Sequence, residues 1–199
     1  MTPDEAAGVV TAAEWTDQVE QVAPDDVRVG AVDRLTGITP AMFAWWFTAM
    51  DAESYRQFHP RDHCDFAWTR GKEPGAYVGA THRTHHRYGG TGPLLRTEIT
   101  FLEPGSVFPP AALEVPGHLL AARVHPLDDR DRPAAAPIGH FVHVVLPRPG
   151  GSELRSKWWL RVDEHTDLEL VTAGRLRHVH EEFGFLQQFL PGLYDRRAH

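Results

Sequence analysis

The sequence is poor in several features, and each scarcity excludes a class of protein. Its 199 residues contain one cysteine, Cys64, which excludes an internal disulfide and a thiolate metal cluster. The net charge is −7, whereas a nucleic-acid surface needs clustered Lys and Arg, so no nucleic-acid partner is expected. No apolar run approaches the roughly 18 residues of a membrane span, and the N-terminus lacks a signal-peptide pattern. We therefore predict a soluble, cytoplasmic protein with no membrane partner.

What remains is the composition of an ordinary globular domain. Hydrophobic residues make up 42% and charged residues 24% of the chain. At this length folding buries roughly 70% of the surface of the unfolded chain, enough for both a core and a pocket. Residues 1–26 are rich in Ala and acidic residues, with a weak helical pattern around Ala12–Val22. We predict a peripheral N-terminal extension over 1–26 and one domain over 27–199.

The predicted domain begins with a strand over Val27–Val32. Two helix signals follow it. Thr39, followed by a proline, is the predicted N-cap of a helix rich in aromatic residues. Asp51 begins a second short helix that runs through Tyr55. It should end before His59-Pro60, because a residue that precedes proline is disfavoured in helical conformation.

Period-two alternation follows, and it predicts a run of antiparallel strands. These strands are expected over Ala76–Tyr88, Leu94–Phe101, His118–Val124, Ile138–Leu146 and Leu154–Val162. The glycine-rich segment 89–93 predicts a hairpin turn between the first two, and residues 148–151 predict one between the last two. The segment Asp128–Pro137 is expected to be an exposed loop.

The chain closes with one long predicted helix over Val171–Leu190, which Pro191-Gly192 should stop. Strand, two short helices, antiparallel strands and a terminal helix together indicate an α+β fold. This order favours an antiparallel sheet wrapped around the last helix. Such an arrangement leaves a cavity between sheet and helix where a small ligand can bind.

The terminal helix carries a polar pair on an apolar face. One stripe of this helix is core-like, and a second stripe consists of His178, Glu182, Phe185 and Phe189. A buried carboxylate is costly unless it is paired or binds a metal, and an i, i+4 pair can reach one ion. The pair therefore predicts two metal ligands. The alternative is a His–Glu hydrogen bond at the edge of the core.

Three further histidine groups have both functional and structural interpretations. His59 and His63 lie beside aromatic residues and suit a metal or proton-transfer role, or else a surface turn. His82 and His86 share one strand face, which Glu98 joins if the hairpin closes about the glycine turn; a solvated outer face is the alternative. On the strand over 138–146, His140 and His143 point to opposite faces, and His143 can line the cavity or pack in the core.

Taken in order, these motifs resemble the diacetylphloroglucinol hydrolase family, whose domain is a helix-grip of the Bet v 1/START-like type. The resemblance spans about residues 38–194. The matching motifs are Trp45-Trp46-Phe47, Tyr55 with His59-Pro60-Arg61-Asp62-His63, Gly89-Gly90, His143, Leu154–Leu160, and His178 with Glu182 running into Phe189–Tyr194.

The resemblance implies a zinc-dependent enzyme that hydrolyses the carbon–carbon bond between an acyl group and a phenolic ring. Two histidines and two glutamates hold the zinc in that family. By position His63, His178 and Glu182 match three of these ligands. The fourth position, a glutamate in the family, holds His86 here, with Glu98 as its competitor. The expected cofactor is therefore Zn²⁺ in a site of three histidines and one glutamate.

The resemblance also implies how the substrate is handled. Tyr55 matches a substrate-contacting tyrosine and His143 a pocket histidine, so both are expected to be catalytic, positioning substrate and moving protons. Trp46, Phe66 and Trp158 are expected to form an apolar wall for an acylated aromatic or polyketide-like molecule, and Trp158 replaces a tyrosine of the family.

Two rival functions and one assembly state complete the expectations. The chain could be a non-catalytic carrier of a hydrophobic metabolite, or a metal-dependent cyclase or lyase on the same scaffold. A site with no open coordination position would favour the carrier. A homodimer is the assembly state considered.

Overall fold

One antiparallel sheet of eight strands dominates the computed structural model, which describes residues 1–198. Its strand order is β1-β2-β8-β7-β6-β5-β4-β3. The strands are β1 (Gln18–Ala23), β2 (Asp26–Thr36), β3 (His63–Arg70), β4 (Thr81–His86), β5 (Leu95–Leu102), β6 (His118–Pro126), β7 (Gly139–Arg148) and β8 (Gly151–Arg161). The α-helices are α1 (Pro3–Thr11), α2 (Pro40–Ala49), α3 (Ala52–Phe58), α4 (Pro110–Leu113) and α5 (Arg175–Arg197).

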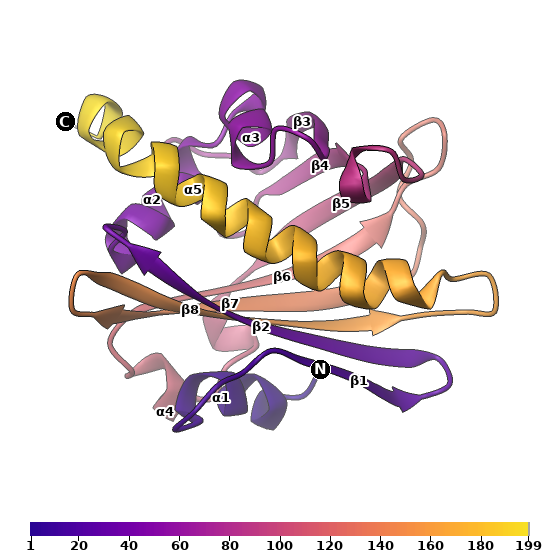
Figure 1. The fold of residues 1–199 in the computed structure, drawn as a ribbon, viewed down its shortest axis with the longest axis horizontal. Helices are drawn as coiled ribbons and strands as arrows, with labels where there is room; N and C mark the ends of the chain where they lie inside the picture. The colour runs from indigo at the N-terminus through magenta and orange to yellow at the C-terminus, as the bar shows by residue number, and fades with distance from the viewer. Residues whose placement is uncertain (199) are drawn as a thin grey trace.

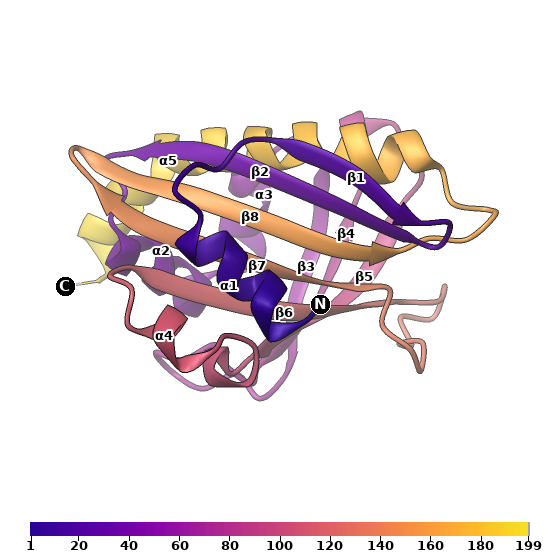
Figure 2. The same cartoon turned by 90° about the horizontal axis from the view of Figure 1, so that it is seen from below.

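Helices cover both faces of this sheet. The long helix α5 runs across one face, with α2 and α3 beside its C-terminal half (Figure 1). Seen from below, α1 and α4 lie on the opposite face (Figure 2). We call the face toward α5 the inner face and the other the outer face. The α+β helix-grip fold predicted from the sequence is confirmed.

Each face has its own hydrophobic core, and the alternation along β7 shows how the two are separated. Phe141 and Val145 belong to the inner core with the apolar stripe of α5. Val142, Val144 and Leu146 belong to the outer core with residues of α1. Successive side chains of a strand point to opposite faces, so period two gives the middle strands two buried faces.

The N-terminal segment packs on the outer face. A capping box between Thr2 and Glu5 begins α1, and Val9 and Val10 are buried. The Arg155 guanidinium donates to the carbonyls of Val9 (3.2 Å) and Ala12 (2.7 Å), which ties the end of α1 to β8. The division into an extension and a domain at residue 26 stays a prediction.

The helical pattern predicted around Ala12–Val22 is wrong. The residues Gln18–Ala23 form the edge strand β1, which pairs with β2. Val19 and Val22 of this strand are 47% and 45% exposed. They cover no core, so backbone pairing with β2 decides the conformation.

Local capping signals are confirmed, since the side chains of Thr39 and Asp51 accept the predicted N-cap hydrogen bonds. The predicted stop at Pro191 is wrong, because α5 continues to Arg197. Beyond the proline, Leu193 is buried in the inner core. Packing therefore maintains the last turns despite the backbone hydrogen bond that proline cannot make.

The strand predicted from Ala76 begins only at Thr81, and β3 was not predicted from the sequence. Residues 71–80 form a loop in which Gly71, Gly75 and Gly79 have positive φ.

Among the described residues 1–198, no helix is long and apolar enough to cross a membrane.

Candidate metal centre

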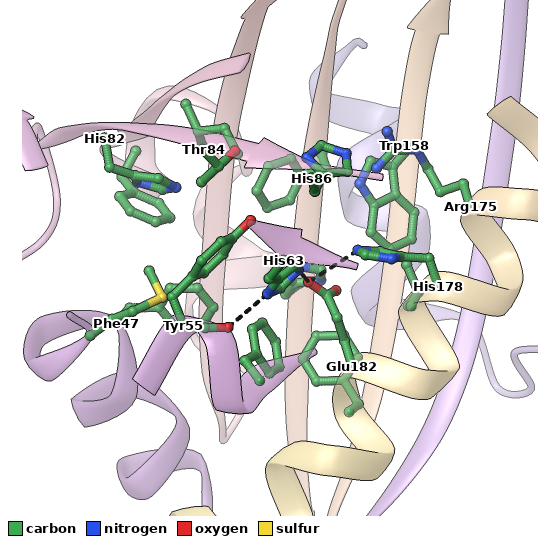
Figure 3. A pocket seen from close by; sticks show the side chains of 18 residues that line it. Phe47, Tyr55, His63, His82, Thr84, His86, Trp158, Arg175, His178 and Glu182 are labelled. Carbon is green, nitrogen blue, oxygen red and sulfur yellow. Dashed lines mark hydrogen bonds and ion pairs between the residues drawn. The ribbon is translucent and has the colours of Figure 1, made fainter. Parts of the chain in front are cut away.

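A cavity of about 100 Å³ lies between α5 and the inner face of the sheet. Most of its wall is apolar and aromatic, and a polar cluster occupies one side (Figure 3). The lining residues are Phe47, Met50, Tyr55, Phe58, His63, His82, Thr84, His86, Ile99, Phe101, Phe141, His143, Trp158, Arg175, His178, Val179, Glu182 and Phe183.

Three of the predicted ligands meet in this cluster. His178 and Glu182 project from adjacent turns of α5, and His63 lies at the start of β3. The Glu182 Oε1 atom is 3.0 Å from His63 Nε2 and 3.5 Å from His178 Nε2. One donor atom from each of the three residues lies within 4.8 Å of the others. Two imidazole nitrogens and one carboxylate oxygen therefore converge on one point.

The end of α3 orients His63. The Nδ1–H of His63 donates to the carbonyl of Tyr55 (2.8 Å), and the two rings stack with centroids 3.9 Å apart. Because Nδ1 is used in this bond, the lone pair of a neutral His63 is on Nε2, the nitrogen that faces Glu182. A metal ligand needs such a fixed tautomer.

Asp62 orients His178 in the same way, and the sequence analysis did not identify it. The Asp62 side chain is 1% exposed, and its Oδ2 accepts hydrogen bonds from His178 Nδ1 (2.9 Å) and the Gly89 amide (3.1 Å). Burial raises the pKa of Asp62, but the bond from His178 and the charge of His59 outweigh it, so the pKa lies well below its usual range. A carboxylate–histidine pair of this kind commonly supports a metal ligand.

The electrostatics of the site favour a positive charge at the point of convergence. Burial lowers the pKa of His178, but the carboxylates of Glu182 and Asp62 outweigh this and raise it above the usual value. Burial likewise raises the pKa of Glu182, and the neighbouring His178 and His63 pull it well below its usual range. A metal cation at this point would compete with a proton on His178, so metal binding would release that proton.

His86 is near this group but outside it. It pairs with His63 across β3 and β4, lines the cavity, and has its ring centroid 5.6 Å from that of His178. Its donor atoms are not part of the convergent set of three. Its role as a fourth ligand stays a prediction.

Glu98, the competing fourth ligand, is on the other side of the sheet. Thr84 pairs with Thr97, so the register differs by one residue from the predicted one and Glu98 pairs with Arg83. The Glu98 carboxylate bonds to Arg70 Nη2 at 2.7 Å. The prediction that Glu98 shares a face with His82 and His86 is therefore wrong.

A long connection between the strands causes this shift. The Arg87 amide donates to the carbonyl of Asp62 (2.9 Å) rather than to β5, and a 3-10 turn over Tyr88–Gly90 follows. The ladder therefore closes at His86 and Leu95. A one-residue change in register moves every side chain of a strand to the opposite face.

The two residues expected to be catalytic both line the cavity. Burial and the charge of Glu182 raise the pKa of Tyr55 well above its usual value, so its hydroxyl keeps its proton. The Nδ1 of His143 lies 2.7 Å from the buried Ser156 hydroxyl, which the sequence analysis did not identify. Burial lowers the pKa of His143 to about 4, so the imidazole is neutral at pH 7 and Nε2 is left for the cavity.

The expected apolar wall is only partly in the cavity. Trp158 lines it, whereas Trp46 and Phe66 do not. Trp46 is fully buried between the rings of Phe58 and Phe189. Phe66 lies behind Tyr55, with ring centroids 5.2 Å apart. These two positions support the wall rather than form it.

His59 belongs to a second group of candidate donors with Asp62 and His178. It is fully buried, and its Nδ1 accepts the Asp62 amide (3.2 Å) while its Nε2 lies 3.1 Å from Glu181 Oε2. Both ring nitrogens are therefore occupied. This histidine acts as a support that connects Asp62 to the surface carboxylate of Glu181.

The residues present fit a catalytic metal. Two histidines and one glutamate form a recognised ligand set of catalytic zinc, which keeps a further position for water or substrate. The outer hydrogen bonds to Tyr55 and Asp62 fix both imidazoles, as such sites require.

The DAPG hydrolase PhiG domain model matches residues 26–195. The chain belongs to this family. The match contains the whole cavity and its convergent donors and begins at the first residue of β2, so α1 and β1 precede it. The predicted family is confirmed, and membership indicates a hydrolase on a Bet v 1-like scaffold.

Solved structures similar to this chain confirm the fold. A protein from Rhodobacter sphaeroides has a TM-score of 0.52 at 16% identity, covering 89% of this chain and 99% of its own. Ara h 8.0201 gives 0.52 at 10% identity, covering 84% and 99%. Major latex-like protein 151 from Panax ginseng gives 0.53 at 9%, covering 82% and 96%. None of the curated protein sequences matches this chain.

Proposed function

We propose that this protein is a zinc-dependent hydrolase that cleaves a carbon–carbon bond next to a ketone in an acylated aromatic or polyketide-like small molecule. The observation that carries the proposal is the convergence of His63, His178 and Glu182 inside a largely aromatic cavity. Family membership supports hydrolysis. The metal and the bond that is cleaved are our inference.

The residues that would hold the ion come from strand β3 and helix α5. Nε2 of His63, Nε2 of His178 and the carboxylate of Glu182 would hold the ion, and His86 is the candidate for a fourth ligand. A bound zinc ion polarises an acyl carbonyl and lowers the pKa of a coordinated water.

Tyr55 and His143 would handle the protons. Hydrolysis adds a hydroxyl group to the acyl carbon, which leaves as an acid, and a proton to the ring carbon. The Tyr55 hydroxyl keeps its proton and can donate a hydrogen bond to a substrate oxygen. The neutral His143, held at Nδ1 by Ser156, can accept and return a proton at Nε2.

The aromatic wall would orient the ring of the substrate and exclude water from it. Trp158 and Phe141 lie with centroids 6.2 Å apart and an interplanar angle of 30°, and Phe183 contributes from α5. Flat, rigid side chains favour a planar ligand, because they lose little conformational freedom on binding.

The test measures bound metal and acid release together. We expect the purified protein to contain zinc and to release acetate from 2,4-dihydroxyacetophenone, and we expect chelation or His178→Ala to abolish the release. His165→Ala, at an exposed histidine, is the matched control and should keep both metal and activity.

The alternatives give different results in the same assay. Acid release that persists in the chelated protein would reject a metal-dependent reaction. Binding without turnover would indicate the carrier, and a product formed without acid would indicate a cyclase or lyase. The cytoplasmic location, the homodimer and the absence of a nucleic-acid partner stay predictions.

A further inference from the structure

Arg175 places a guanidinium group at the edge of the cavity. It is the first residue of α5 and lines the cavity with His86 and Trp158. Its guanidinium carbon lies 5.4 Å from the ring centroid of Tyr88 and 5.9 Å from that of Trp158. Figure 3 shows the side chain extending from the helix toward Trp158, on the same side of the cavity as His86. The two rings hold the cation in place.

This guanidinium has no anionic partner in the part of the chain that the structure describes. Its Nε is buried and makes no hydrogen bond, and no carboxylate of residues 1–198 forms an ion pair with it. Arg83, which is also partly buried, is by contrast paired with Asp65 and Asp131. Leaving a partly buried cation unpaired is unfavourable.

The groups around Arg175 cannot supply the missing acceptor. The buried Asp62 and the partly buried Glu182 already accept hydrogen bonds from histidines, and neither forms an ion pair with Arg175. The Tyr88 hydroxyl is also buried without a hydrogen-bond partner. The same end of the site therefore contains two unsatisfied groups, and one of them is a cation.

We propose that Arg175 binds a carboxylate carried by the aromatic ring of the substrate, which makes the preferred substrate an acylated aromatic acid. The planar guanidinium can donate two parallel hydrogen bonds to a carboxylate, which a neutral amide cannot match. The proposal rests on the proposed function for the acyl group, while the anion-binding step is independent of turnover.

The experiment compares two ligands of nearly the same shape, one with a carboxylate and the other with a neutral amide. Binding of 2,4-dihydroxybenzoate and 2,4-dihydroxybenzamide is measured by calorimetry on the full chain, as purified and again after chelation. Chelation ensures that the carboxylate does not bind a metal instead. We expect the wild type to prefer the benzoate by about tenfold or more in both states. Arg175→Gln should bring the ratio close to one, and Arg175→Lys should leave a preference of a few fold.

Arg177→Gln is the matched control, because Arg177 is an exposed arginine on the same helix and outside the cavity. It should keep the wild-type ratio. Equal binding of both ligands by the wild type, an unchanged ratio in Arg175→Gln, or an equal loss in Arg177→Gln would overturn the proposal. If Arg175→Gln does not fold, the ratio of the two affinities in the wild type and in Arg175→Lys tests the proposal.

Failure of this proposal and failure of the proposed function are distinguishable. If the protein prefers the benzoate but releases no acid, the carboxylate site is supported and the hydrolase function is rejected. If the protein releases acid but binds the benzoate and the benzamide equally, the hydrolase function is supported and the carboxylate site is rejected.

Discussion

The two faces of strand β7 differ in what they bury. On the outer face Val142, Val144 and Leu146 pack with α1 in an apolar cluster. On the inner face His143 lines the cavity beneath α5. On the outer face the short helix α1 packs on the sheet through apolar side chains, whereas the inner face and α5 enclose a cavity in which polar side chains converge. One face of this strand thus contributes to the stability of the fold, and the other face contributes to the candidate site.

The difference teaches that stability and chemistry should respond to different substitutions. Outer-face changes should lower the free energy of unfolding and leave the metal in place. Changes at the inner polar cluster should remove the metal and affect the fold less, because α5 also packs through its own apolar stripe. The predictions below test this separation.

The largest effect is expected for Glu182→Gln. Removing the carboxylate eliminates the anion on which both histidines converge, so bound metal should be lost and acid release should fall by about 10³-fold or more. Metal analysis of the purified variant and the acetophenone assay measure this. Retention of full metal content would show that Glu182 is not a ligand.

Leu146→Ala tests the outer face. Truncating this buried side chain should lower the free energy of unfolding by about 2–4 kcal/mol, because it removes apolar contacts and leaves a cavity. Denaturant unfolding gives the value, and metal content should stay at the wild-type level. Loss of metal from the folded variant would contradict the separation of the two faces.

Asp62→Asn tests the orienting hydrogen bond. The amide keeps the shape of the carboxylate but removes its charge and its strong bond to His178 Nδ1. Metal affinity should fall by about 10- to 100-fold. Competition with a chromophoric chelator measures this, and an unchanged affinity would show that Asp62 has no role in metal binding.

His82→Phe tests the pH dependence of the aromatic part of the cavity. Burial lowers the pKa of His82 in the folded protein to about 3, from the usual 6.5 of a free histidine. The unfolded chain therefore binds a proton that the folded protein does not, and stability falls as pH decreases from about 6.5 toward 3. Between these two pKa values the slope is about 1.4 kcal/mol per pH unit.

Phenylalanine should remove this contribution, since its ring fits among Phe66, Trp68 and Phe101. Unfolding measured at several pH values gives the slope, with His165→Phe as the exposed control. The same slope in His82→Phe and wild type would contradict the prediction.

Glu98→Gln should have the smallest effect and is the matched control for Glu182→Gln. Its carboxylate is largely buried but pairs on the outer face with the largely exposed Arg70, where solvent screens the charge, so the pair contributes about 1 kcal/mol or less. Metal content and acid release should match the wild type. Metal loss in this variant would restore Glu98 as a candidate ligand.

How well the sequence predicted each feature depended on how local its physical cause is. The N-caps at Thr39 and Asp51 are fixed within three residues, and both were predicted. The i, i+4 spacing of His178 and Glu182 follows from the helix itself. By contrast, Glu98 was placed on the wrong face, because a turn and an amide bond to Asp62 set the register.

The sequence by itself determined the α+β order, the alternation of the strands and the helix pair at the centre of the candidate site. Only the tertiary structure brought Asp62 to His178, residues 116 positions apart, and Ser156 to His143. It also left Arg175 at the cavity edge without a carboxylate partner among residues 1–198. Periodicity and capping act between near neighbours along the chain. Hydrogen bonds that orient a ligand, and groups left unpaired, depend on which distant segments the fold packs together.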